Sequence, residues 1–223
     1  MSIRRASIED AQRLGEASSA TYRTTYAGMF GDDKWLDEAT PEYFFQMWKQ
    51  DLDEQEKVGP VVVSEVDASI VGFASAEWSG DRGDRYKDLP DDAFQEIREL
   101  YVLKDHQGSE DGHHGTQLLL ALVKLLNPTK KAVAHAAAKN SRIREFMSDL
   151  KAEIHVDGTV VVFQNRNVKI DVPRATFYWN VKDLQSSLES RSRPGWAGRF
   201  SSKPPRTAHT WPPDKRLVET VRR

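Results

Sequence analysis

The residues of this chain whose types and spacing could do chemistry are gathered in one segment, 94–126. A run of strand-forming residues is followed by a loop that contains Gly108 and Gly112, and then by an apolar helix that begins at Gly115 and Thr116. A glycine-rich loop before a helix presents backbone N–H groups and the positive end of the helix dipole to an anion. The segment therefore predicts an anion-binding loop.

Three histidines near this loop, His106, His113 and His114, could bind a metal ion with Asp105 and Asp111. Their spacing matches no ligand pattern that a metal site requires, and histidines in loops are more often solvated. The chain has no cysteine, which excludes disulfides, thiolate metal sites and cysteine nucleophiles. We therefore predict that the protein uses no metal.

The charge is distributed unevenly along the 223 residues, although the formal net charge is only −2. Residues 190–223 hold nine Lys and Arg against two Asp and Glu, about +7, so the rest of the chain carries about −9. We predict a folded domain over residues 1–184 and a basic, Pro-rich, poorly ordered tail over 185–223. The basic residues of the tail are scattered rather than clustered, so nucleic-acid binding is the less favoured function for it.

The sequence carries no signal for export or for membrane insertion. Its first ten residues lack the apolar stretch of a secretory signal, and no run of about 18 apolar residues occurs. We expect a cytoplasmic protein without a membrane partner, and a nuclear location stays open. Dimers are the commonest oligomers, so a homodimer stays open as well.

The segments before the loop carry helix and strand patterns in a mixed order. Residues 2–6 can form a short strand, and the capping-box sequence of Ser7 and Asp10 predicts a helix over 8–25. Pro41, capped by Thr40, begins a second helix. Runs at 61–63 and 70–78 predict a hairpin, 79–92 a loop and 97–103 the next strand.

The segments after the loop carry further helix and strand patterns. The helix that begins at Gly115 is followed by a strand over 131–137, and Asn140 or Ser141 can cap a further helix. Strands are predicted over 159–164 and 174–181, with a turn and a strand edge between them. The order β α α β β β α β α β β predicts an α/β fold with a mixed, mostly antiparallel central sheet flanked by helices.

Several of these segments together resemble the GNAT superfamily of acetyl-CoA-dependent N-acetyltransferases, over residues 1 to about 181. IRRASIEDAQRLGEASSATYRTTYAGMF is similar to the opening strand and helix of that family, and VVVSEVDASIVGFASAEW to its hairpin. ELYVLKDHQG, from Glu99 to Gly108, resembles the fourth strand running into the pyrophosphate loop. GTQLLLALVKLL resembles the helix that follows, and NSRIREFM, from Asn140 to Met147, the helix that an Asn begins.

The resemblance implies that acetyl-CoA is the co-substrate and that no metal takes part. The pantetheine arm would pair with the backbone of the fourth strand, and the pyrophosphate would lie in the loop. An amine must lose a proton before it attacks the thioester, and the resemblance makes Glu99 the base. The residues implied in binding acetyl-CoA are Leu100, Tyr101, Val102, Leu103, Gln107, Gly108, Gly112, His113, His114, Gly115, Thr116 and Asn140.

The resemblance also implies an acceptor, the amine of a small molecule or peptide. Tyr22 and Tyr26 would wall its pocket, because in the family this helix end borders the acceptor site. The same residues have ordinary alternatives. Aromatic residues at helical spacing are commonly core, Asn140 is equally suited to cap its helix, and Glu99 equally to a solvated strand position.

The sequence departs from the family pattern at several places, two of which bear on these roles. The loop gains three residues between Gly108 and Gly112, among them the acidic Glu110 and Asp111. Met147 stands where the family has the tyrosine that protonates the leaving thiolate. These departures motivate a second hypothesis, a GNAT-like module that has lost catalysis and serves in binding or regulation.

Overall fold

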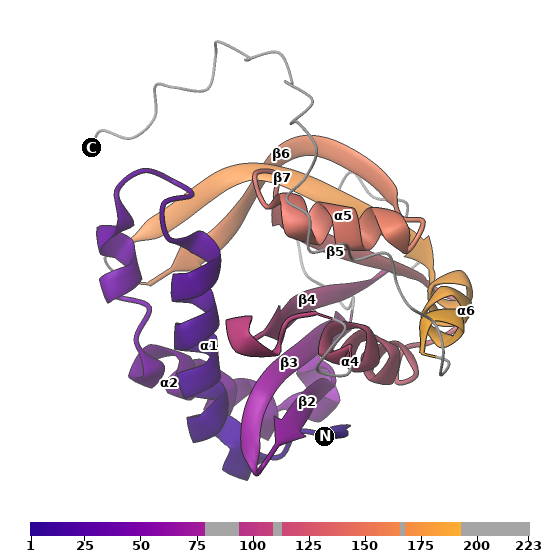
Figure 1. The fold of residues 1–223 in the computed structure, drawn as a ribbon, viewed down its shortest axis with the longest axis horizontal. Helices are drawn as coiled ribbons and strands as arrows, with labels where there is room; N and C mark the ends of the chain where they lie inside the picture. Colours follow the sequence, from indigo (N-terminus) through magenta and orange to yellow (C-terminus); the bar gives the residue numbers. More distant parts are fainter. Residues whose placement is uncertain (79–93, 109–112, 166–167, 193–223) are drawn as a thin grey trace.

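The computed structural model describes residues 1–78, 94–108, 113–165 and 168–192. These residues form one seven-stranded sheet in the order β1-β2-β3-β4-β5-β7-β6, with helices on both of its faces (Figure 1). Every neighbouring pair of strands in this order is antiparallel except β4 and β5, which are parallel. The predicted α/β fold with a mixed, mostly antiparallel sheet is therefore confirmed.

The elements follow the predicted order. The strands are β1 (Ser2–Arg5), β2 (Val61–Val66), β3 (Ser69–Trp78), β4 (Phe94–Val102), β5 (Lys131–Ala137), β6 (Glu153–Gln164) and β7 (Lys169–Asn180). The helices are α1 (Ala11–Tyr26), α2 (Pro41–Asp53), α3 (Gln55–Val58), α4 (His114–Val123), α5 (Ser141–Asp149) and α6 (Val181–Arg191), with 3-10 turns η1 (Ile8–Asp10), η2 (Asp33–Asp37) and η4 (Lys104–His106). The one-turn helix α3 and the helix α6 are additions to the predicted order.

The sheet separates two hydrophobic cores. Helices α1 and α2 cover one face, where Leu14, Phe44, Trp48 and Phe73 are almost fully buried. Helices α4, α5 and α6 cover the other face, and Figure 1 shows α4 and α6 on the side opposite α1 and α2. Gly15 lets α1 cross α2 closely, because a Cβ on it would lie 2.6 Å from the carbonyl oxygen of Pro41.

The local signals in the sequence act as their chemistry predicts. The Thr40 side chain accepts a hydrogen bond from the backbone N–H of Tyr43 at 3.1 Å and so caps α2. The β2–β3 hairpin closes through Asp67 and Ala68, whose φ angles of 49° and 63° are those of a two-residue turn with the twist of the strands. These two signals set the first residue of α2 and the position of the turn between β2 and β3.

The C-terminal part of the fold extends further than the sequence indicates. The helix α6 continues beyond residue 184, with Leu184 and Leu188 fully buried against the core that contains α4. β6 and β7 also begin before the predicted 159 and 174. Val181, Leu184 and Leu188 are buried and have the i, i+3, i+7 spacing of one helix face, but the predicted strand over 174–181 took in Val181. Residues 193–223 lie outside the described part of the chain.

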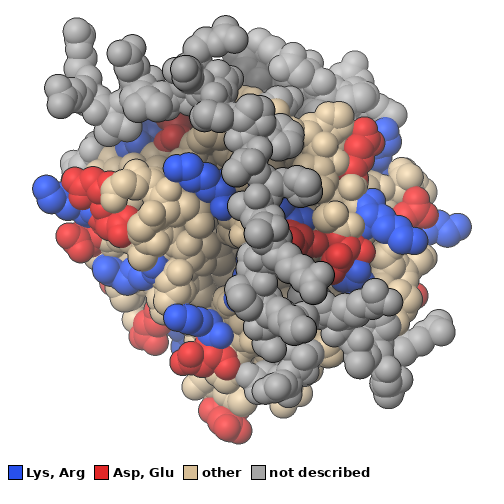
Figure 2. All heavy atoms as spheres, turned by 45° about the horizontal axis from the view of Figure 1, so that its top comes forward, with Lys and Arg blue, Asp and Glu red and all other residues tan. Residues whose placement is uncertain are grey.

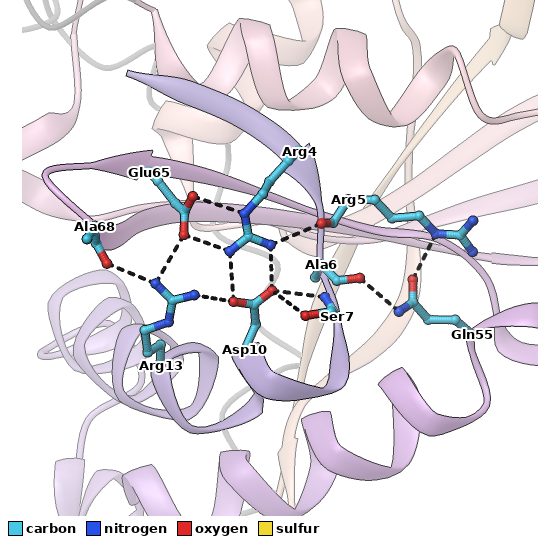
Figure 3. Close-up of polar contacts among 9 residues, drawn as sticks. All are labelled: Arg4, Arg5, Ala6, Ser7, Asp10, Arg13, Gln55, Glu65 and Ala68. Atoms are coloured by element: carbon cyan, nitrogen blue, oxygen red, sulfur yellow. Dashed lines mark hydrogen bonds and ion pairs between the residues drawn. The ribbon is translucent and has the colours of Figure 1, made fainter.

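A network of charged side chains joins β1, α1 and β2 (Figure 3). Asp10, only 1% exposed, accepts hydrogen bonds from Arg4 Nη1 at 2.6 Å and Nη2 at 2.8 Å. Arg4 also donates from Nε and Nη2 to Glu65 at 3.0 and 2.7 Å, and Arg13 forms ion pairs with both carboxylates. The hydrogen bonds from Arg4 hold the pKa of Asp10 well below its usual range.

The surface drawn in Figure 2 has both signs of charge next to one another, with Lys and Arg beside Asp and Glu. The described residues of that face thus form a mixed surface rather than a basic stripe. Within the described ranges, no helix has the length and apolar character needed to cross a bilayer. The predicted loop at 79–92 lies among residues outside this description.

Candidate active site

β4 separates from β5 in the middle of the sheet. The two strands pair only from Phe94 to Ile97 of β4, opposite residues 131–134 of β5. β5 then continues to Ala137 along β7, and β4 continues along β3. The edge of β4 that faces β5 therefore has no strand beside it, among the described residues, from Arg98 onward. That edge includes Leu100, Tyr101 and Val102, the strand residues predicted to bind the pantetheine arm.

A β-bulge lies at the same point. In the pairing of β3 with β4, Ser75 is opposite Glu99 and Ala76 is opposite Ile97, so Arg98 is the extra residue. Bulges bend a strand and re-aim its side chains, and they are common beside active sites. Here both Arg98 and Glu99 have contacts or charge interactions with residues of α2, on the face that α1 and α2 cover.

Glu99 is half-buried, and its Oε2 atom is closed off from solvent. Among the described residues Oε2 has no hydrogen-bond partner. Burial raises the pKa of the Glu99 carboxyl to about 7, from an ordinary 4.5. An unpartnered buried polar atom costs roughly 1–3 kcal/mol, and such costs persist mainly where function requires them. Glu99 is thus a carboxylate that can take up a proton near neutral pH.

Arg98 does not hold Glu99 in its ionised form, although it is the preceding residue. Its Nη1 lies 3.0 Å from Asp51 Oδ2 of α2, and its Nε lies 3.5 Å from Glu77 Oε2 of β3. The charge of Arg98 lowers the pKa of Glu99, but the negative charges of Asp51 and Glu96 raise it. Burial therefore decides the direction of the shift.

Four tyrosines lie around Glu99: Tyr22 and Tyr26 of α1, Tyr43 of α2 and Tyr101 of β4. Burial, and then the negative charge of Glu99 and other nearby groups, raise the pKa of all four, to about 12 for Tyr26. The hydroxyls of Tyr26 and Tyr101 are 2.8 Å apart, and the rings of Tyr22 and Tyr101 have centroids 5.4 Å apart. The two tyrosines predicted to wall the acceptor pocket therefore lie beside the predicted base.

Residues 103–108, the described first part of the loop, follow directly after β4. The Gln107 amide donates a hydrogen bond to the carbonyl of Val102 at 2.6 Å. Gly108 has φ of 129°, a conformation that favours glycine, and a Cβ there would have open space around it. Leu103, predicted to bind with the strand, precedes the turn η4. Gly112 and the two loop acids lie outside the described residues.

The predicted residues at the start of α4 take different roles. His113 is the residue before the helix and has a left-handed φ of 57°. His114 is buried, its Nδ1 lies 2.7 Å from Ser64 Oγ of β2, and its ring packs against that of His106. Gly115 has open space beyond Val102, and Thr116 is buried.

Helix α5 has the cap that the sequence predicts. The Asn140 side chain accepts a hydrogen bond from the backbone N–H of Ile143 at 3.2 Å, which is its ordinary capping role. Met147 is 2% exposed and packs in the core with α4 and α6. The position where the family pattern has a tyrosine is therefore part of the core here. A role of Asn140 toward acetyl-CoA stays a prediction.

The described histidines and acids show no metal centre. Across the described ranges, no group of three or more His, Asp or Glu side chains is arranged to hold a metal ion. His106 packs edge-to-face on His114, with ring centroids 5.8 Å apart. Asp111, one of the two acids that could join them, is outside the described residues.

Comparison with solved structures identifies the architecture. PaiA N-acetyltransferase from Thermoplasma acidophilum, in complex with coenzyme A, superposes with a TM-score of 0.52 at 16% identity, covering 80% of this chain and 98% of that one. A GCN5-related N-acetyltransferase from Rhodopseudomonas palustris gives 0.54 at 18% identity, covering 78% and 93%. Ribosomal-protein-alanine N-acetyltransferase from Brucella melitensis gives 0.50 at 20%, covering 79% and 98%.

This chain has the GNAT fold. No protein-family model matches its sequence, and no curated protein matches it either. Identities of 20% or less establish the architecture alone. What the chain does within the GNAT fold must therefore be argued from its own residues.

Some of the residues predicted for the site lie close together in this GNAT fold. The structure brings Glu99 together with Tyr22 and Tyr26, and it places Gln107 and Gly108 at the end of β4. It adds the side chains of Tyr43 and Tyr101 beside Glu99, which the sequence reasoning did not single out. The spacing of Glu99 and Tyr101, two residues apart on a strand, was the available signal, because such residues share a face.

Proposed function

We propose that this protein is an N-acetyltransferase that transfers the acetyl group of acetyl-CoA to an amine of a small molecule or peptide. The observation that carries the proposal is Glu99. A carboxylate with a buried, unpartnered oxygen and a pKa of about 7 lies where β4 leaves β5 in a GNAT fold. A general base works best when its pKa is near the working pH.

The reaction is a direct attack. Glu99, or a water beside it, takes a proton from the amine, whose nitrogen then forms a bond to the acetyl carbon while the carbon–sulfur bond breaks. Backbone N–H groups on the unpaired edge of β4, after Ile97, would polarise the carbonyl. The leaving thiolate takes a proton from water or another donor, because Met147 offers none.

The residues at the proposed acetyl-CoA site suit that ligand. The pantetheine arm carries amides that can pair with a strand edge, and β4 has such an edge from Arg98 onward. Gly108 gives a backbone conformation that other residues resist, with open space around it for a phosphate to approach. Coenzyme A is bound by the PaiA N-acetyltransferase structure described above. Leu100 to Leu103, Gln107 and the start of α4 are the residues we propose to hold acetyl-CoA.

Binding of acetyl-CoA is the first test. Calorimetry with the full chain should give a dissociation constant in the micromolar range, and no heat at millimolar acetyl-CoA would contradict the proposal. Gly108→Ala should weaken binding, because alanine resists a φ of 129°. Gly31→Ala is the matched control: its φ is 93° and its surroundings are equally open, so it carries similar backbone strain in a different loop.

Acetyl transfer is the second test. Release of the CoA thiol is measured with a panel of primary amines, namely aliphatic polyamines, aromatic amines and peptides with free N-termini. Binding of acetyl-CoA without transfer to any amine would favour the other hypothesis, a binding or regulatory module. A cytoplasmic location, a homodimer and the role of the basic tail stay predictions that these two tests do not address.

A further inference from the structure

Two buried polar atoms lie on paired positions of neighbouring strands. Ser75 of β3 is directly opposite Glu99 of β4. Residues opposite one another in an antiparallel pair point to the same face of the sheet, with Cβ atoms about 5 Å apart. Ser75 is 3% exposed, and neither its Oγ nor Glu99 Oε2 has a hydrogen-bond partner among the described residues.

Several other polar groups near Glu99 have partners elsewhere. The Tyr26 and Tyr101 hydroxyls hydrogen-bond each other, and the Tyr43 hydroxyl donates to the carbonyl of Gln164 at 2.6 Å. The charged groups around Glu99 are Arg98 and Glu96 on its own strand, Glu77 on β3 and Asp51 on α2. Arg98 is bound by Asp51 and Glu77, and the acids cannot donate to a carboxylate.

We propose that Ser75 is a positioning residue for Glu99: its hydroxyl donates a hydrogen bond to Glu99 Oε2, directly or through one water, when that carboxyl is ionised. Among the described residues, the Ser75 hydroxyl on the facing strand β3 is a donor that has no other hydrogen-bond partner. The bulge next to this pair gives the two strands a local bend at the residues concerned. The catalytic part of this role rests on the proposed function, in which Glu99 accepts the proton of the amine.

A carboxyl ¹³C titration of Glu99 by NMR tests the hydrogen bond itself. A donor that binds the ionised form lowers the pKa of a carboxyl, so Ser75→Ala should raise the pKa of Glu99 by about one pH unit. Ser75→Thr keeps the hydroxyl and should restore the wild-type titration. Ser19→Ala is the matched control, because Ser19 is another buried serine but donates to the carbonyl of Ala39 at 2.7 Å. An unchanged titration in Ser75→Ala would overturn the proposal.

A double-mutant cycle tests it independently of the titration. Ser75→Ala should lower the denaturant midpoint more at pH 8 than at pH 5, because only the ionised carboxyl needs the donor. In the Glu99→Gln background this pH difference should vanish. A pH difference that persists in the Glu99→Gln background, or that is missing in the wild-type background, would contradict the proposal.

The titration of Glu99 tests the role of Ser75 separately from the proposed acetyltransferase function. The titration requires neither acetyl-CoA nor an acceptor. A Glu99 that responds to Ser75→Ala in a protein that does not bind acetyl-CoA would overturn the acetyltransferase and leave the hydrogen bond standing. Acetyl-CoA binding with no response to Ser75→Ala would overturn the role of Ser75 alone.

Discussion

Asp10 and Glu99 are two carboxylates of this fold whose surroundings are opposite. Asp10 is 1% exposed and accepts hydrogen bonds from Arg4 and from the backbone N–H of Ser7 at 2.9 Å, with Arg13 as a further partner. Glu99 has a buried oxygen with no partner among the described residues. The pKa of Asp10 lies well below its usual range, whereas that of Glu99 is raised to about 7.

These different surroundings give the two carboxylates different roles: Asp10 stabilises the fold, whereas Glu99 is suited to accept a proton. Asp10 gains hydrogen bonds when it is ionised, so its charge helps to hold β1, α1 and β2 together. Burial makes the ionised form of Glu99 unfavourable, so the fold loses stability by keeping this carboxylate. Residues that reduce stability in this way are concentrated at functional sites.

The largest expected effect comes from removing the charge of Glu99. Glu99→Gln should lower kcat/KM for acetyl transfer at pH 8 by at least about 100-fold, because the general base is lost. The dissociation constant of acetyl-CoA, measured by calorimetry, should stay as in wild type. If the Gln variant kept full activity, Glu99 would be a buried carboxylate without a catalytic role.

Removing the charge of Asp10 should act on stability instead. Asp10→Asn should lower the free energy of unfolding by roughly 2 kcal/mol, because hydrogen bonds to charged groups are lost in a buried place. Denaturant unfolding at pH 7 measures it, with acetyl-CoA affinity expected to be unchanged. Asp171→Asn is the control: Asp171 pairs with Lys169 at 3.0 Å on the exposed surface, so little change is expected there.

The pH dependence of stability should show the opposite signs of the two carboxylates. Between pH 4.5 and about 7 folded Glu99 keeps a proton that the unfolded chain has released, so its contribution lowers stability as pH rises through this window. Glu99→Gln should therefore be more stable than wild type at pH 8, by on the order of 2 kcal/mol, and similar at pH 4. For Asp10 the lowered pKa stabilises the fold at neutral pH, and this stability is lost only in acid. Equal pH profiles for wild type and Glu99→Gln would show that Glu99 titrates normally.

The smallest effect is expected at the tyrosines beside Glu99. Tyr26→Phe removes the 2.8 Å hydrogen bond to Tyr101 and should lower the free energy of unfolding by about 1 kcal/mol. If Tyr26 borders the acceptor, the KM for the amine should rise while the affinity for acetyl-CoA stays constant. Tyr43→Phe, which loses a bond to the Gln164 carbonyl nearer the surface, is the comparison. Equal KM values for the amine in wild type, Tyr26→Phe and Tyr43→Phe would show that Tyr26 does not border the acceptor.

The fold was predictable where one local signal decides an element. Thr40 before Pro41, the turn at Asp67 and Ala68, and Asn140 before α5 each fix a boundary through a single hydrogen bond or dihedral angle. α6 was missed because Val181, which shares its buried face with Leu184 and Leu188, was assigned to the preceding strand. These residues pack in the same core as α4.

The candidate site was predictable only at the positions that the resemblance to the GNAT family indicates. Glu99 and Tyr22 come from distant parts of the chain, and only the packing of α1 on the sheet brings them together. His114 was predicted to bind in the loop, but its ring is buried and contacts Ser64 and His106. Ser75 gives no signal in the sequence, because its significance depends on the register of β3 with β4.

One titration compares the two carboxylates most directly. Carboxyl ¹³C NMR of the wild-type protein, labelled in Asp and Glu and assigned with Glu99→Gln and Asp10→Asn, follows both groups from pH 3 to pH 9. We predict that Glu99 titrates with a pKa of about 7, while Asp10 stays ionised throughout. A Glu99 that titrates near its ordinary value of 4.5 would contradict the claim that this fold keeps a carboxylate ready to accept a proton.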